Sequence, residues 1–329
     1  MEMTRNREHR GTNNEPRIAI VGSGPVGGIL GAHLIQAGQP VIFCDIQESH
    51  LEAIRETGLC LTGVFEATVK CDHVAYSVAG LANFPAVDTL VIATKAYVMP
   101  DLVTELTELG RPGLRFVSCQ NGLDNEEFLA AFFGADNVLR MVVNYAGSQM
   151  GDGRILASFF TPPNYIGAMT AAGEPLARRL AEALTSARLE THFTTDIKKH
   201  EWEKAILNSL LNPVCALTRK PMKDMMDLVS TEGLVEKLLQ EGIAVAQAAG
   251  ITLSEGFYEC ALEYLKEAGY HRTSMHQDII RHLPTEIDWV SAKIVEIGRA
   301  HGVATPYNLT IAALIKGLEM ESGAPQERA

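Results

Sequence analysis

Three polar side chains stand four residues apart in one apolar segment: Lys204, Asn208 and Asn212. On an α-helix this spacing places them in a single stripe, while the isoleucine and leucines between them supply apolar packing. A glycine-rich signature, IAIVGSGPVG, opens the same chain, and an isolated acid, Glu286, follows the stripe. Together these features are typical of a reductase cleft. The alternative interpretation is a lysine on a solvated helix face with two asparagines near the helix end.

The glycine-rich signature directly follows a β-branched run and precedes a helical pattern. Its residues are Gly22, Ser23, Gly24, Pro25, Val26 and Gly27. In such a turn the first glycine makes the bend, the second lets a pyrophosphate approach the backbone, and the helix N-terminus offers unpaired N–H groups to the anion. Further glycines in the helix permit close packing on a sheet. We therefore predict a dinucleotide site, with a purely structural tight turn as the alternative.

An acid ends the second predicted strand, VIFCDI, at Asp45. A carboxylate there can accept hydrogen bonds from both hydroxyls of an adenine ribose, whereas a 2′-phosphate would meet a like charge. The residues thus favour NAD(H) as the preferred cofactor, with NADP(H) as the second candidate. Asp45 could instead cap the helix that follows, and the two roles are compatible.

Two later strand ends carry polar side chains. Lys95 follows the run TLVIAT, and Asn121 follows RFVSCQ. The carboxyl ends of parallel strands face the ligand in open α/β sheets, so we expect both residues near the cofactor and substrate. An exposed lysine after a strand is common, and this is the alternative for Lys95.

The order of elements predicts an α/β fold in two parts. Up to residue 195 short strands alternate with amphipathic stretches, which indicates a Rossmann-type, doubly wound, mainly parallel sheet that finishes in an antiparallel meander over RILASFF and LETHFTTDI. Long segments of 3.6-residue period follow. We predict a disordered leader (1–16), a dinucleotide-binding domain (17–195) and an all-helical substrate and catalytic domain (196–329), with the cleft between the two domains.

Composition excludes several classes of function. The 329 residues are 47% hydrophobic with a net charge of -12, and no apolar run approaches the length that spans a bilayer. The acidic net charge and the lack of clustered Lys and Arg argue against a nucleic-acid-binding function. The six scattered cysteines suggest buried thiols in a reducing cytoplasm, and the polar leader lacks the apolar core of a signal peptide. His271, His276 and His282 lack the spacing of a metal site, so we expect no metal.

Several separated motifs, in order, resemble the ketopantoate reductase family (2-dehydropantoate 2-reductases) over essentially the whole chain after the leader. They are IAIVGSGPVGGILGAHL, ATKAY, QNGLDNEE, WEKAILNSLLNP, SMHQDI and TEIDWVSAKIVEIGRAHGVATPYN. The resemblance implies NAD(P)H-dependent reduction of 2-dehydropantoate to (R)-pantoate, a step toward coenzyme A. The partner it implies is a small 2-oxo acid substrate. A homodimer is one candidate assembly of the chain.

The resemblance also implies roles for individual residues. Lys204 would be the general acid and Glu286 part of the catalytic hydrogen-bond network. Asn208 and Asn212 would contact the substrate, and Ser274 would hold its carboxylate. These residue types suit the chemistry, because hydride addition to a 2-oxo carbon develops alkoxide charge that an ammonium can stabilise and protonate.

Alternatives remain for the later residues. Ser274 and Gln277 form a capping-box pattern, and Glu286 would lie in the first turn of a helix that Thr285 could cap. Two departures from the family pattern also matter. Asp45 stands where the family typically has a basic residue, which predicts a preference for NADH. His271 stands where the family often has Asn, so it is a candidate substrate-binding residue of altered specificity.

Three other functions compete with pantoate formation. The same scaffold could reduce another small 2-oxo acid. β-Hydroxyacid dehydrogenases share a K-x-x-x-N element but place a glycine-rich segment just before the lysine, which KKHEWEK lacks. A non-catalytic nucleotide-sensing protein would need the glycine turn but no proton donor, so Lys204 and Glu286 together argue against it.

Overall fold

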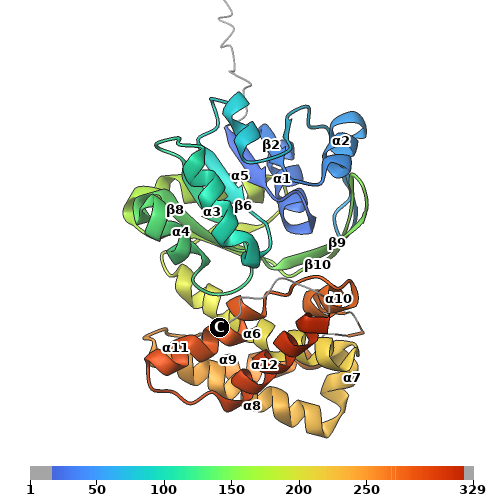
Figure 1. Ribbon diagram of the computed structural model, residues 1–329, viewed down its shortest axis with the longest axis vertical. Helices are drawn as coiled ribbons and strands as arrows, with labels where there is room; N and C mark the ends of the chain where they lie inside the picture. The colour runs from blue at the N-terminus through green and yellow to red at the C-terminus, as the bar shows by residue number, and fades with distance from the viewer. Residues whose placement is uncertain (1–16, 268, 271, 322–329) are drawn as a thin grey trace, which may run out of the picture.

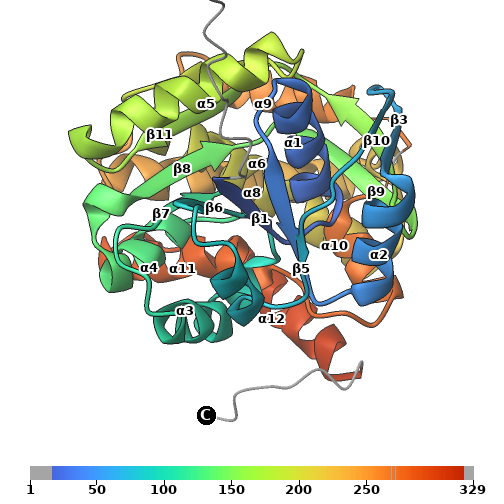
Figure 2. The same ribbon diagram turned by 90° about the horizontal axis from the view of Figure 1, so that it is seen from above.

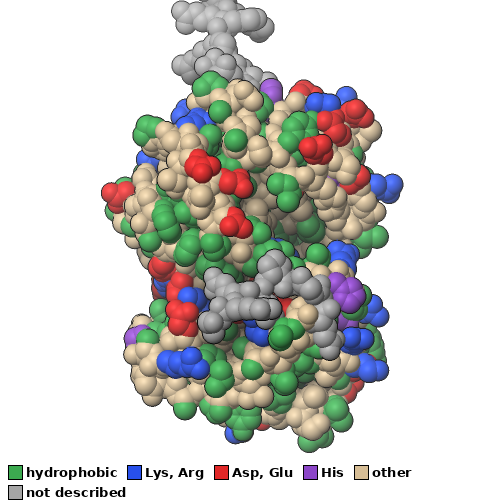
Figure 3. All heavy atoms as spheres, in the orientation of Figure 1, with side chains coloured by type: hydrophobic (Ala, Val, Ile, Leu, Met, Phe, Trp, Pro, Cys, Tyr) green, Lys and Arg blue, Asp and Glu red, His purple; other side chains and the backbone are tan. Residues whose placement is uncertain are grey.

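The computed structural model describes residues 17–267, 269–270 and 272–321. The predicted leader (1–16) and His271 therefore lie outside the described residues. The chain builds an α/β half, coloured blue to green in Figure 1, and a helical half, coloured yellow to red, packed below it. Within the described part, no helix is both long and apolar enough to cross a membrane. On the face drawn in Figure 3, acidic and basic side chains are interspersed.

An eight-stranded sheet organises the first half. Its order is β12 (Thr191–Phe193), β11 (Asn164–Ala168), β8 (Val138–Val142), β7 (Arg115–Ser118), β6 (Thr89–Ile92), β1 (Ile18–Val21), β2 (Val41–Cys44) and β5 (Val74–Ala75). Every neighbouring pair is parallel except β8 and β11. The predicted doubly wound, mainly parallel sheet is confirmed.

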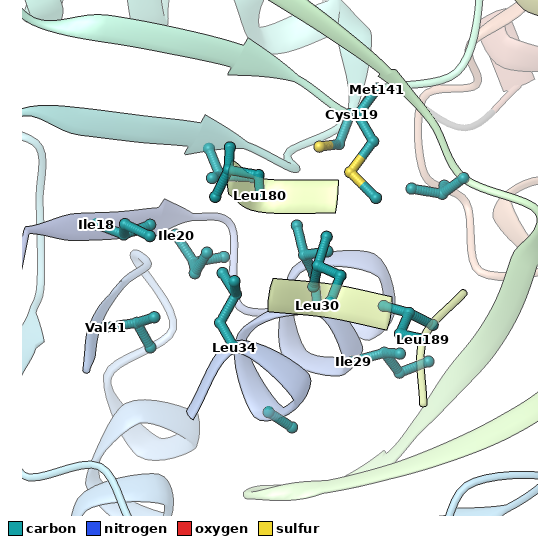
Figure 4. Packing of buried hydrophobic residues seen from close by; sticks show 14 of the residues in the cluster. Ile18, Ile20, Ile29, Leu30, Leu34, Val41, Cys119, Met141, Leu180 and Leu189 are labelled. Atoms are coloured by element: carbon teal, nitrogen blue, oxygen red, sulfur yellow. The ribbon is translucent and has the colours of Figure 1, made fainter. Parts of the chain in front are cut away.

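Helices cover both faces of this sheet. Helices α1 (Pro25–Gln36), α2 (Glu48–Thr57) and α5 (Glu174–Ser186) lie on one face, and α3 (Met99–Glu108) and α4 (Asn125–Phe133) lie on the other, as Figure 2 shows. Because strand side chains alternate, Ile18 and Ile20 join the core under α1, while Ala19 and Val21 join the opposite core. Figure 4 shows the first core, where Leu30 and Leu34 of α1 face Ile20.

The predicted antiparallel meander at the end of the main sheet was wrong, because part of it belongs to a second, four-stranded sheet. This second sheet has the order β4 (Ala67–Val69), β3 (Leu59–Gly63), β10 (Arg154–Phe160) and β9 (Tyr145–Gly151). RILASFF is strand β10 of this sheet because it pairs with β9 and with β3, a strand distant in sequence. Strand β12 runs parallel to β11, so that part of the meander was also wrong. Short 3-10 turns η1 (Ala79–Asn83), η2 (Ala96–Val98), η3 (Ala135–Asn137) and η4 (Ala171–Gly173) complete this half.

The second half is helical, as predicted. Its elements are α6 (Ile197–Thr218), α7 (Met222–Asp227), α8 (Val229–Ala248), α9 (Phe257–Lys266), α10 (Ser274–Ile280), η5 (Ile287–Trp289), α11 (Ser291–Ala300) and α12 (Pro306–Glu321). Helix α6 continues through Pro213, and its apolar side chains Ile206, Leu210 and Leu211 are buried against the surrounding helices. Four of the six cysteines are buried, whereas Cys260 is exposed and Cys60 half-buried.

Candidate active site

The glycine turn has the geometry that a dinucleotide requires. Gly22 has φ +96°, and a Cβ on it would lie 2.8 Å from the Thr94 nitrogen. A Cβ on Gly27 would lie 1.9 Å from the Gly22 carbonyl oxygen, whereas one on Gly24 would meet no atom within 4 Å. The turn is thus closed toward the sheet and open at Gly24, where α1 begins with Pro25 and no side chain caps its N–H groups. These features fit a bound pyrophosphate.

Asp45 lies beside this turn. Its carboxylate accepts hydrogen bonds from the Ser23 nitrogen at 2.7 Å, the Ser23 hydroxyl at 2.9 Å and the Gln47 nitrogen at 3.0 Å. Helix α2 begins at Glu48 with Gln47 as its N-cap, so Asp45 does not cap that helix. A negative charge therefore stands at the end of β2, next to the glycine turn.

Two polar side chains that the sequence did not predict, His50 and Tyr145, form hydrogen bonds to backbone carbonyls of the glycine turn. His50 is buried, and its Nδ1 accepts from the Gly153 nitrogen at 3.1 Å. Its Nε2 must then carry the proton and donates to the Ser23 carbonyl at 3.1 Å. The Tyr145 hydroxyl donates to the Val26 carbonyl at 3.0 Å. A histidine inside an amphipathic helix has no local signal for this contact.

Lys95 and Asn121 meet the helical half at Glu286. The Glu286 carboxylate accepts from the Ala96 nitrogen at 3.0 Å and from Asn121 Nδ2 at 3.3 Å. Lys95 Nζ lies 3.8 Å from Glu286 Oε2 and 2.6 Å from Asp278 Oδ2. Burial lowers the pKa of Lys95, but Glu286 and Asp278 outweigh burial and raise it. Asp278, on α10, was not among the predicted site residues.

Glu286 is not in the first turn of an α-helix, as one alternative predicted. It precedes the 3-10 turn η5, and α11 begins only at Ser291. The reason is that Thr285 is bound to Glu319 of α12 through its nitrogen at 2.7 Å and its hydroxyl at 2.6 Å. The Trp289 carbonyl meanwhile accepts from the Leu123 nitrogen at 3.0 Å. These contacts hold Glu286 against Asn121.

Lys204 lies on α6 at the junction of the two halves. Its Nζ donates to the Val143 carbonyl at 2.5 Å, directly after strand β8. Burial, reinforced by the nearby Arg140 charge, lowers the pKa of Lys204 to about 7, although Glu286 opposes the shift. An ammonium with such a pKa can release its proton near neutral pH.

The other predicted substrate residues lie on α6 and α10. Asn208 and Asn212 are half-buried on α6, and the Asn212 carbonyl accepts from the Thr273 hydroxyl at 3.4 Å. Ser274 is the first, exposed residue of α10. The cap is Thr273, whose hydroxyl accepts from the His276 nitrogen at 3.3 Å, so the Ser274 capping box was wrong. Thr273, one residue earlier, has the extended backbone of an N-cap, and its hydroxyl already binds a free N–H group of the first helical turn.

The fold and the glycine turn define an NAD(P)-dependent oxidoreductase. The sequence matches the family described as ketopantoate reductase PanE/ApbA over residues 18–170, and its C-terminal part, ketopantoate reductase PanE/ApbA C terminal, over residues 196–319. The chain belongs to the ketopantoate reductase family.

Relatives and solved structures agree with this assignment. The 2-dehydropantoate 2-reductase of Pyrococcus abyssi is 28% identical over 309 residues, which cover 93% of this chain and 99% of that protein. The crystal structure of 2-dehydropantoate 2-reductase from Geobacter metallireducens is 26% identical, with a TM-score of 0.82 over 92% and 99% of the two chains. A complex of D-mandelate dehydrogenase with NADH is 25% identical, with a TM-score of 0.81 over 93% and 99%.

Proposed function

We propose that this protein reduces 2-dehydropantoate to (R)-pantoate with NADH and that Lys204 is its general acid. In this proposal residues 17–195 bind the cofactor and residues 196–329 supply most of the substrate site. The observation that carries this proposal is the set of contacts at the junction of the two halves. Glu286 of the helical half contacts Lys95 and Asn121, which follow strands β6 and β7, and the charge of Glu286 acts on Lys204 of α6.

The proposed reaction uses these side chains in distinct roles. A bound reduced nicotinamide supplies the hydride to the 2-oxo carbon. The Lys204 ammonium stabilises the charge that develops on the carbonyl oxygen and donates its proton there, so that it ends the step neutral. Its low pKa favours this donation. Asn208 and Asn212 orient the substrate, and Ser274 donates a hydrogen bond to its carboxylate. Glu286 keeps Asn121 and Lys95 in place beside Lys204.

The proposed preference for NADH rests on Asp45. Its carboxylate lies at the end of β2 beside Ser23, where a 2′-phosphate would meet negative charge. The D-mandelate dehydrogenase complex, which contains NADH on a similar fold, supports the proposal. The predicted homodimer remains a prediction that light scattering of the purified protein can test.

A second candidate substrate follows from the same structural neighbour. D-Mandelate dehydrogenase acts on a 2-hydroxy acid with an aromatic side chain, and its structure covers nearly all of this chain. The stripe Lys204, Asn208 and Asn212 would recognise the 2-oxo acid group whatever the side chain. The alternative function is therefore reduction of another small 2-oxo acid.

Initial rates separate these candidates. Purified protein is assayed with 2-dehydropantoate, 2-oxoisovalerate and benzoylformate, each with NADH and NADPH at equal concentration. We expect the highest kcat/KM with 2-dehydropantoate and NADH. A higher value with benzoylformate would favour the second candidate, and a higher value with NADPH would overturn the role of Asp45. Lack of turnover with all three acids would overturn the proposed function.

A further inference from the structure

A buried charge cluster lies one helical turn from Lys204. Arg140 of β8, Glu126 of α4 and Glu201 of α6 have side chains that are 3%, 1% and 0% exposed. Arg140 Nε lies 3.2 Å from Glu201 Oε1 and 3.5 Å from Glu126 Oε2. Burying three ionisable groups is costly, so their placement beside a reactive lysine calls for an explanation.

The remaining Arg140 nitrogens hold the loop that carries Asn121. One terminal nitrogen donates to the Ser118 hydroxyl at 3.0 Å, and the other donates to the Gly122 carbonyl at 2.9 Å. Asn121 lies between these two anchor points. On the far side of the loop, a Cβ on Gly122 would lie 2.4 Å from the Trp289 carbonyl oxygen, so the loop has no room to shift toward η5.

Two side-chain contacts join α6 to β8 and to the residue that follows β8. Arg140 of β8 pairs with Glu201 of α6, and the carbonyl of Val143, directly after β8, accepts from Lys204 of α6. Glu201 and Lys204 lie three residues apart on α6, so Arg140 contacts the same stretch of α6 that presents Lys204. One guanidinium therefore contacts both the loop of Asn121 and the helix of Lys204.

We propose that Arg140, with Glu201 and Glu126, is a positioning set that holds Lys204 and Asn121 in register across the junction. This inference rests on the proposed role of Lys204 as general acid. Arg140 touches neither residue's reactive atoms, so its effect on the reaction passes through their placement and through the local field.

The charges around Lys204 and Arg140 are consistent with this assignment. Arg140 lowers the pKa of Lys204, while Glu286 and Cys119 oppose that effect. Arg140 itself faces Glu201, Glu126, Cys119 and Glu127. Burial raises the pKa of Glu126, but Arg140 and Lys198 outweigh burial and hold it at about 2. Burial and the neighbouring Glu126 raise the pKa of Glu201, against the opposing effect of Arg140 and Lys198.

The chain offers a matched control. Arg111 also anchors a loop, donating to the carbonyls of Phe84 at 3.1 Å and Pro85 at 2.9 Å, but it precedes β7, whereas Asn121 follows that strand. We expect Arg140→Lys to lower kcat by about 10²-fold with the dissociation constant of NADH nearly unchanged, because misplaced groups slow a reaction strongly. Arg111→Lys should keep the kcat of the wild type. Equal kcat in Arg140→Lys and the wild type, both folded, would overturn the proposal.

Two further measurements decide the outcome where Arg140→Lys fails to fold or the wild type shows no turnover. Ser118→Ala removes the hydroxyl that Arg140 contacts, together with its hydrogen bond to Gln120, and we expect a several-fold loss of kcat; no loss would count against the positioning set. NMR titration of protein labelled at lysine Cε follows Lys204 directly. The resonance of Lys204 is identified as the one that is missing from the spectrum of Lys204→Met. Arg140→Gln should move its midpoint to higher pH. An unmoved midpoint would overturn the inference whether or not the protein turns over a 2-oxo acid.

Discussion

Two lysines approach the same carboxylate from opposite halves of the molecule, and their surroundings give them opposite properties. Lys95 pairs with Asp278 at 2.6 Å and Glu286 at 3.8 Å, and these carboxylates raise its pKa despite burial. Lys204 has a carbonyl partner and Arg140 nearby, and its pKa falls to about 7. A lysine with two carboxylates holds its proton, whereas a lysine with a carbonyl and a like charge can release it. This difference supports the proposal that Lys95 binds charge and that Lys204 transfers the proton.

The largest expected effect comes from removing the proposed proton donor, Lys204. Lys204→Met should lower kcat by about 10³-fold, because general acid catalysis contributes on that order. The dissociation constant of NADH, measured by fluorescence, should stay close to that of the wild type. Lys237→Met, at an exposed lysine of α8, is the control for loss of a lysine. An equal loss of kcat in Lys204→Met and Lys237→Met would contradict the distinct role of Lys204.

Glu286→Gln should affect both lysines and come next in size. The glutamine keeps the shape but removes the negative charge that raises the pKa of Lys95 and opposes the lowering at Lys204. We expect kcat/KM to fall by about 10²-fold. The alkaline decline of kcat/KM should begin at lower pH than in the wild type. A decline that moves to higher pH would contradict the account.

Lys95→Met should have a smaller effect on turnover and a different signature. It leaves Asp278 and Glu286 without their cation, so we expect about a 10-fold loss in kcat/KM together with a lower Tm. Adding Asp278→Asn should restore part of the Tm. The alkaline limb of the pH profile should stay near that of the wild type. Loss of the alkaline limb in Lys95→Met would mean that Lys95, and not Lys204, is the titrating lysine.

The smallest expected effect is on stability. The folded pKa of Lys204 is about 7, below the ordinary value of 10.5, so the unfolded chain binds more protons between these values. This group therefore makes the protein less stable below pH 7, and the cost disappears as pH rises toward 10.5. Lys204→Met should raise Tm by about 2–4 °C at pH 6, with less gain at pH 9.5. A lower Tm at both pH values would contradict the stated cost of burial.

Local sequence patterns predicted the parts of the site that depend on one element. The glycine turn, the polar stripe on α6 and the acid after β2 each follow from patterns among residues close together in the sequence. The partners Asp278 and Arg140 could not be found this way, because their contacts join residues far apart in the chain.

The errors in secondary structure have the same origin. Strand β10 pairs with β3 instead of extending the main sheet, and no local pattern specifies that partner. At the start of α10 two adjacent hydroxyl residues, Thr273 and Ser274, both suit a cap, and backbone conformation decides for Thr273. At Glu286, the contact of Thr285 with Glu319 replaces a regular helix start.

The most direct test of the central claim is the pH dependence of NADH oxidation with 2-dehydropantoate, compared with NADPH and with Lys204→Met. Because Lys204 must be protonated to act as the acid, kcat/KM of the wild type should decline as pH rises through about 7. The account predicts faster turnover with NADH, this decline, and its loss together with nearly all activity in Lys204→Met. A rate that is independent of pH in this range, or unchanged in Lys204→Met, would contradict it.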